Sequence, residues 1–183
     1  GATVSVSPGS TTSYSVTRVA DLGTSGPCLA TSLGSAAVVT VNPNPVLTLT
    51  NGTASLCSGD QTDIMLNSPT SNHVITVTGV SYGAVTGGGV LVGDTFVDGD
   101  QLQEILENPT NGVVTVSYTF EVTTSDGCPV SPAGQLASVD VQPRPTMSIT
   151  NTVPALCSGS STSITLNSAV TGSLMRLTGV SGT

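Results

Sequence analysis

The sequence predicts an all-β protein made of tandem two-sheet sandwiches, each about 100 residues long, and two observations lead to this prediction. The first is a repeat: the tetrapeptide Leu-Cys-Ser-Gly at 56–59 returns at 156–159, 100 positions later. The second is the composition, in which Ser, Thr, Gly and Val dominate and charged residues make up only 8%. Thr and Val favour strands, whereas Gly, Asn and Pro favour turns, so little of the chain is suited to a helix.

The repeat divides the chain into one complete unit and two partial ones. The pattern Val-x-Pro-x-Pro at 41–45, for example, returns at 141–145. Residues 1–45 match the C-terminal part of a unit, 46–145 form a complete unit, and 146–183 match the N-terminal part of the next. Neither partial unit has the strands that would cover its apolar face, so we expect the sequence to be a window of a longer protein.

In the first partial unit, Tyr14 and Val16 alternate with polar neighbours, which is typical of a half-buried strand. A loop is expected over 21–27, ending at Cys28. Prolines at alternate positions of 42–45 hold the chain extended and remove backbone donors, so we expect one sheet to end there.

The complete unit begins with short strands separated by turns. Residues 51–59 form the connection that carries Cys57, and the glycine-rich residues 83–93 form a flexible middle. Residues 101–107 are ambiguous, because their Leu and Ile side chains have helical spacing but the segment is short, and we favour an edge strand or a single turn. The first three strands are expected over 47–50, 64–66 and 75–77.

The clearest strand spans 114–122, where Val, Val, Tyr, Phe and Val occupy every second position. This strict alternation predicts a sandwich strand with one buried face. With a closing strand over 139–141, the unit has about seven strands in 100 residues, which fits an immunoglobulin-like sandwich. Aromatic residues make up only 3%, so the core should be thin and its stability should depend on neighbouring units or cross-links.

The charge of the chain excludes two classes of partner. The net charge is −8, with three Arg and no Lys. Nucleic acids and anionic lipids both select clustered Lys and Arg. No apolar run approaches the ~18 residues of a membrane span. We therefore expect no nucleic-acid partner and no membrane insertion by this segment.

Two cysteines per unit suggest an oxidising compartment. In a seven-strand sandwich, Cys57 and Cys128 fall at opposite ends, tens of ångströms apart at ~3.3 Å per residue, whereas a disulfide tolerates only about 4.4–6.8 Å between Cα atoms. We therefore favour junction disulfides to units outside the window for Cys28, Cys57, Cys128 and Cys157, with Cys57 bonding the next unit's counterpart of Cys128. A bond between Cys57 and Cys128 would need a different strand order and stays open as the alternative.

One motif suggests catalysis. Gly-Val-Ser-Tyr-Gly at 79–83 fits the nucleophile elbow, in which a strand turns sharply into a helix and exposes the serine. Here no helix is expected to follow, the single histidine, His73, precedes the serine in a polar turn, and the copy that begins at 179 breaks the pattern. We interpret the match as chance, assign no catalytic residue, and expect that the chain is not an enzyme.

The acidic cluster over 94–107 suggests a metal site. Asp94, Asp98 and Asp100 are weak candidates for calcium, which takes six to eight oxygen ligands. Their spacing lacks the full EF-hand loop, and acidic surface loops usually serve solubility. We therefore expect no cofactor and no metal, with calcium at these three residues as the alternative.

The order of motifs over nearly the whole chain resembles a known family. The motifs are Leu-Cys-Ser-Gly before a strand, Thr-Gly-Val, Leu106-x-Asn108, the strand from 114, an Asp-Gly-Cys turn and a closing Val-x-Val-x-Pro-x-Pro. They are similar to the PKD-like and immunoglobulin-like repeats of giant Bacteroidetes cell-surface proteins, including gliding-motility adhesins. Residues 83–100 match the family pattern least.

The resemblance implies a structural role at the cell surface, in adhesion or gliding. Such proteins are exported through the outer membrane by the type 9 secretion system and displayed as long filaments. The implied partners are adjacent repeats of the same chain, surface polysaccharide or substratum, and the secretion and motility machinery. Two alternatives are spacer repeats that present a distant catalytic or carbohydrate-binding domain, and a self-assembling pilus-like or surface-layer polymer in which a donated strand completes a sandwich.

Overall fold

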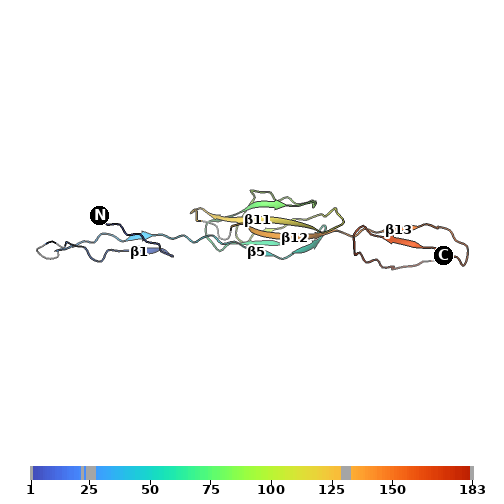
Figure 1. Ribbon diagram of the computed structural model, residues 1–183, viewed down its shortest axis with the longest axis horizontal. Helices are drawn as coiled ribbons and strands as arrows, with labels where there is room; N and C mark the ends of the chain where they lie inside the picture. The colour runs from blue at the N-terminus through green and yellow to red at the C-terminus, as the bar shows by residue number, and fades with distance from the viewer. Residues whose placement is uncertain (1, 22, 24–27, 129–132, 182–183) are drawn as a thin grey trace.

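The computed structural model describes residues 2–21, 23, 28–128 and 133–181, and these residues form strands and no helix. The all-β class predicted from the sequence is therefore confirmed. Figure 1 shows three parts in a row along the long axis: a thin N-terminal part, a wider central body and a thin C-terminal part.

The central body, residues 46–145, contains two sheets. The smaller sheet has three strands in the order β10-β7-β5, and the larger sheet has five in the order β6-β12-β11-β8-β9. In chain order these strands are β5 (Thr48–Asn51), β6 (Ser55–Cys57), β7 (Ile64–Asn67), β8 (His73–Ser81), β9 (Thr95–Phe96), β10 (Gln101–Leu102), β11 (Val114–Thr124) and β12 (Gln135–Gln142).

Buried side chains of both sheets belong to a single cluster, as expected for a β-sandwich. Tyr118 and Phe120 of β11 are its largest members. Every second residue over 116–122 is buried, so the alternation that predicts this strand is confirmed. All members of the cluster lie between Leu47 and Val141. The central body therefore carries a complete core of its own.

Two short strands differ from the sequence prediction. Part of the connection over 51–59 is strand β6, which runs parallel to the end of β12 with Leu56 opposite Val141. The Leu56 side chain is buried, and this burial holds the segment against the sheet. Strand β9 forms the outer edge of the larger sheet, with Phe96 opposite Ile75. Segments this short carry too little alternation to be recognised in the sequence.

The ambiguous segment 101–107 is extended. Its side chains are alternately exposed and buried, and β10 lies at the edge of the smaller sheet. Isolated bridges then join Ile105 to Gln61 and Glu107 to Thr86. Of the two interpretations favoured from the sequence, the edge strand is the one observed. Ile105, which has helical spacing from Leu102, points outward because a strand alternates sides at every residue.

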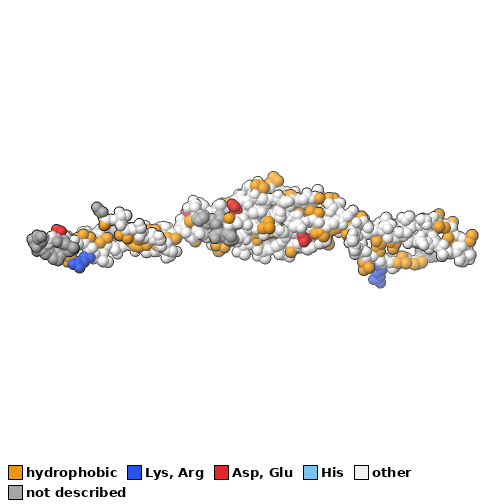
Figure 2. Space-filling view, in the orientation of Figure 1, with side chains coloured by type: hydrophobic (Ala, Val, Ile, Leu, Met, Phe, Trp, Pro, Cys, Tyr) orange, Lys and Arg blue, Asp and Glu red, His pale blue; other side chains and the backbone are white. Residues whose placement is uncertain are grey.

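The N-terminal part contains two hairpin-like pairs. Strand β1 (Thr12–Tyr14) pairs with β4 (Ala37–Val39), and β2 (Ala20–Asp21) pairs with β3 (Cys28–Leu29). Most of the loop expected over 21–27 lies outside the described residues. The C-terminal part contains one pair, β13 (Ser148–Asn151) with β14 (Ile164–Asn167). Figure 2 shows hydrophobic side chains on the visible surface of both terminal parts.

The strand registers of the terminal parts match those of the central body. Strands β13 and β14 pair Ile149 with Leu166, as β5 and β7 pair Leu49 with Leu66. All four residue pairs of the two ladders correspond at an offset of 100. In the N-terminal part, Tyr14 lies opposite Ala37, as Tyr118 lies opposite Ala137. The register therefore assigns Tyr14 as the counterpart of Tyr118.

Candidate functional site

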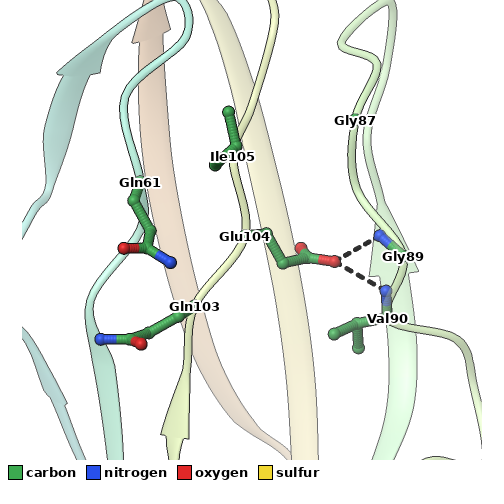
Figure 3. Close-up of a pocket in the computed structure, with 7 residues that line it drawn as sticks. All are labelled: Gln61, Gly87, Gly89, Val90, Gln103, Glu104 and Ile105. Carbon is green, nitrogen blue, oxygen red and sulfur yellow. Dashed lines mark hydrogen bonds between the residues drawn. The ribbon is translucent and has the colours of Figure 1, made fainter.

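The most polar buried group of the central body is the carboxylate of Glu104. The extended segment that begins with β10 places Leu102, Glu104 and Leu106 on its inward face, so the carboxylate lies beside the core. The backbone N–H groups of Gly89 and Val90 donate to its Oε1, the latter at 2.7 Å. Figure 3 shows the carboxylate directed at these two groups, so Glu104 holds the glycine-rich loop against the sandwich.

Two tyrosines complete the hydrogen bonding of this carboxylate. The Tyr118 hydroxyl donates to Glu104 Oε2 at 2.6 Å, and the Tyr82 hydroxyl donates to Oε1 at 2.8 Å. The two rings meet edge to face, with centroids 6.0 Å apart. Burial, followed by the nearby Glu104 carboxylate, raises the pKa of both phenols far above the ordinary value of about 10. Both tyrosines therefore remain neutral hydrogen-bond donors at physiological pH.

Glycines allow the loop to approach this carboxylate closely. A Cβ on Gly88 would lie 2.0 Å from Cε1 of Tyr82, and a Cβ on Gly87 would lie 2.4 Å from the carbonyl oxygen of Ile105. Gly87 also has a positive φ of 89°, a conformation that other residues rarely adopt. The flexible middle expected over 83–93 is thus a docked loop, because its backbone N–H groups have a buried acceptor.

The surface hollow beside Glu104 is lined by Gln61, Gln103 and the loop backbone, and the two amides lie on the side of Glu104 away from the loop (Figure 3). Both oxygens of the carboxylate already accept hydrogen bonds from donors within the chain. These hydrogen bonds give the carboxylate a structural role, because they hold the loop against the sandwich.

The elbow-like motif does not bring its serine to the histidine. His73 and Ser81 are the first and last residues of β8, which has nine residues. At ~3.3 Å per residue they lie roughly 26 Å apart. His73 is half-buried rather than exposed, and its Nδ1 contacts the carbonyl oxygen of Thr70. The two residues therefore cannot act as a nucleophile and base within one copy.

The three calcium candidates are directed at different backbone groups. Asp94 accepts from the N–H of Leu91 and Asp100 from that of Val97, both at 2.8 Å, so each carboxylate closes its own four-residue turn. Asp98 accepts from the N–H of Ser68, also at 2.8 Å. Within the described residues, no three acidic, cysteine or histidine side chains come together as a metal site. This arrangement does not support calcium binding at the three residues, which is the alternative expected from the sequence.

The cysteines lie at the ends of the units. Cys57 is opposite Gln142 in the β6–β12 ladder, at the end where the chain leaves the central body. Cys128 Sγ lies 3.7 Å from the carbonyl oxygen of Asn42, at the end where the chain enters it. The eight residues of β12 separate the two ends, which corresponds to roughly 25 Å. All four cysteines are unbonded in this structure, and Cys28 and Cys157 are exposed.

Both terminal parts expose residues whose counterparts form the core of the central body. Ile164 and Leu166 are 59% and 38% exposed, whereas Ile64 and Leu66 are fully buried. We call two apolar grooves in these parts the half-cores. The N-terminal half-core is lined by Val4, Val6, Tyr14, Val16, Ala37 and Val39. The C-terminal half-core is lined by Met147, Ile149, Leu166, Met175 and Leu177.

No protein-family model matches the chain, and no curated protein matches it. The part of the chain that the structure describes contains no helix of the length and hydrophobicity needed to cross a bilayer.

Proposed function

We propose that this chain is a structural segment of a long extracellular filament or adhesin, built from tandem immunoglobulin-like sandwich repeats. The observation that carries the proposal is that three parts with matching strand registers lie end to end. Units that contact each other only at their ends add length with each repeat. The motif order shared with the surface repeats of Bacteroidetes supports a location on the outside of the cell.

The connection that leaves the central body is fixed to it. The Ser58 N–H donates to the carbonyl oxygen of Gln142 at 2.8 Å. Arg144 Nε donates to the Ser58 carbonyl, and Arg144 Nη2 lies 3.7 Å from Asp60 Oδ1. The exposed ion pair contributes little by itself. Together with the two prolines of 143–145, however, these contacts direct the chain away from the body, as a rod requires.

The length of the rod can be measured directly. We would insert one or two extra copies of residues 46–145 in tandem into the 183-residue chain and record small-angle X-ray scattering. Strand β11 has 11 residues, so each copy should extend the maximum dimension by roughly 35–45 Å, the length of such a strand plus its turns. An increase well below this, from units that fold back on each other, would contradict the rod.

The location is tested on cells that make the protein. Antibodies raised against residues 46–145 should label intact cells, with gold particles at distances from the outer membrane that exceed one unit. An antibody against an intracellular protein serves as the control for intact membranes. Labelling that appears only after the cells are lysed would contradict a surface filament.

A further inference from the structure

The tripeptide Thr-Asn-Gly occurs twice in the central body, at 50–52 and at 110–112. An asparagine amide is least durable where glycine follows, because the glycine nitrogen, which no Cβ shields, can attack the asparagine side chain. The two copies have the same local sequence, so a difference in their reactivity has to come from the fold. We propose that Asn111 is a site of spontaneous conversion to isoaspartate, and that the fold protects Asn51 from the same reaction.

Asn51, the last residue of β5, is held at both groups that take part in this reaction. The Gly52 N–H donates to the carbonyl oxygen of Asp63 at 2.8 Å, so the attacking nitrogen is occupied. The Asn51 amide donates from Nδ2 to the carbonyl oxygen of Ser138 at 2.7 Å, and its Oδ1 accepts from the Thr53 N–H at 3.1 Å. Both groups have to leave these partners before they can react with each other.

Asn111 is exposed in the bend between the extended segment 101–107 and β11. The hydrogen bonds of this bend involve Asn108, Thr110 and the Gly112 backbone, and within the described residues none reaches the Asn111 side chain. The Gly112 nitrogen lies 3.4 Å from Thr110 Oγ1, at the limit of a hydrogen bond. A Cβ added to Gly112 would meet nothing within 4 Å. The attacking nitrogen and the amide are therefore both accessible.

The remaining asparagines do not have this combination of features. Three of them precede proline, which has no N–H that could attack: Asn42, Asn44 and Asn108. Four precede a residue whose side chain shields the backbone nitrogen: Asn67, Asn72, Asn151 and Asn167. Only Asn51 and Asn111 precede glycine, so the comparison between these two isolates the effect of the fold.

The reaction needs no partner other than water. The Gly112 nitrogen attacks Cγ of Asn111 and closes a succinimide ring, while the side-chain amide nitrogen leaves as ammonia with the proton of the Gly112 N–H. Water then opens the ring. Attack of water at Cγ gives aspartate, whereas attack at the backbone carbonyl carbon of residue 111 gives isoaspartate, in which the chain runs through the side chain. A water molecule is consumed, an ammonia molecule is released, and nothing is oxidised.

Isoaspartate alters the turn before β11, because it lengthens the backbone by one carbon atom. The Gly112 carbonyl oxygen accepts from Asn108 Nδ2 at 2.8 Å and from Thr110 Oγ1 at 2.9 Å. The same Asn108 amide donates to the carbonyl oxygen of Val141 at 2.7 Å. The added atom shifts the Gly112 carbonyl away from its two donors, so this product loosens the turn. Aspartate keeps the length of the backbone and leaves the turn in place.

The test compares the two asparagines within one protein. The folded 183-residue chain is incubated at mildly alkaline pH, cleaved at glutamates and analysed by mass spectrometry, with isoaspartate identified by enzymatic methylation. Glu104 and Glu107 lie between the two sites, so the sites fall in separate peptides. Asn111 should convert about tenfold faster than Asn51 or more, the factor expected when hydrogen bonds must first be broken. In urea the two rates should agree within about twofold, because neither site is protected there.

Gly112→Ala is the matched variant, because the open space at this position accepts a Cβ while the Cβ shields the attacking nitrogen. It should slow the conversion of Asn111 several-fold in the folded protein and leave Asn51 unchanged. Equal rates at Asn51 and Asn111 in the folded protein, or an Asn111 that survives while the denatured chain converts, would overturn the proposal.

The effect on the turn is measured against Asn111→Asp, which supplies the other product of the reaction. Hydrogen exchange at the start of β11 should be faster in the isoaspartate form than in Asn111→Asp, and the isoaspartate form should unfold at a lower urea concentration. Identical exchange and identical unfolding of the two forms would overturn the assigned loosening of the turn, whatever the rates of conversion.

Discussion

The Tyr118 hydroxyl donates a 2.6 Å hydrogen bond to Glu104, a carboxylate that also accepts from the backbone of the glycine-rich loop. One side chain thus connects the centre of β11 to the glycine-rich loop. Hydrogen bonds to a buried charged group are stronger than those between neutral groups, and leaving such donors unpaired is costly. The stability of the loop should therefore depend on Glu104.

Replacing Glu104 should destabilise the central body. Glu104→Ala leaves the Gly89 N–H and the Tyr118 hydroxyl without an acceptor. The Val90 N–H and the Tyr82 hydroxyl lose one of their partners but keep each other. We expect a loss of about 3 kcal/mol in the free energy of unfolding. Glu104→Gln keeps one acceptor oxygen for the N–H groups and should lose about half as much. Chemical denaturation measures both. Equal losses for the two variants would show that packing, not hydrogen bonding, is the contribution of this residue.

Closing the space at Gly88 should displace the loop. A Cβ there would lie 2.0 Å from the Tyr82 ring, so Gly88→Ala should cost about 1–3 kcal/mol, as is typical of overpacking. The control is Gly112→Ala, where a Cβ would meet nothing within 4 Å. This substitution also lowers the conformational entropy of the unfolded chain. Hydrogen exchange of Gly89 and Val90 should accelerate in the first variant alone. A stable Gly88→Ala protein with unchanged exchange would contradict the close docking of the loop.

Stability should decrease above pH 10. The pKa values of Tyr82 and Tyr118 are raised in the folded state, so the unfolded chain releases these protons first as the pH increases. The stabilisation is fully present below the unfolded pKa of about 10 and is lost as the pH rises above it. Each tyrosine adds a slope of up to about 1.4 kcal/mol per pH unit. Tyr118→Phe should flatten the pH dependence measured by urea denaturation, and an unchanged slope would contradict the assignment.

The buried amide of Asn108 should stabilise the turn before β11. Its Nδ2 donates to the carbonyl oxygens of Val141 at 2.7 Å and Gly112 at 2.8 Å. Asn108→Ala should therefore cost about 2–3 kcal/mol, because a buried carbonyl loses its donor. The exposed Asn111 of the same turn is the control, and Asn111→Ala should change the unfolding free energy by about 0.5 kcal/mol or less. Similar effects of the two substitutions would argue against the buried network.

Several features of the fold could be predicted from the sequence because they depend on neighbouring residues. Strand β11 follows from alternation of apolar and polar side chains, which depends only on residues two positions apart. The expected partial units follow from the repeat at an offset of 100, which is visible in the sequence alone.

The sequence does not distinguish the structural role of Glu104 from that of the neighbouring acidic residues. In the sequence, Asp94, Asp98 and Asp100 belong to the same acidic cluster as Glu104, yet these three accept from nearby backbone N–H groups while Glu104 is buried. The sequence does contain one indication that Glu104 is buried: in a strand, Glu104 shares one face with the apolar residues Leu102 and Leu106. The helical spacing of the same segment obscured it, because a short segment cannot distinguish the two periods.

By itself, the sequence determined the all-β class, the repeating unit and the strand with strict alternation, since these depend on composition and on local side-chain periodicity. Only the tertiary structure decided that β6 runs parallel to β12 and that a carboxylate holds the glycine-rich loop. The reason is physical: the partners of Glu104 are 14 to 22 residues away in the chain, and such contacts exist only once the sheets have packed together.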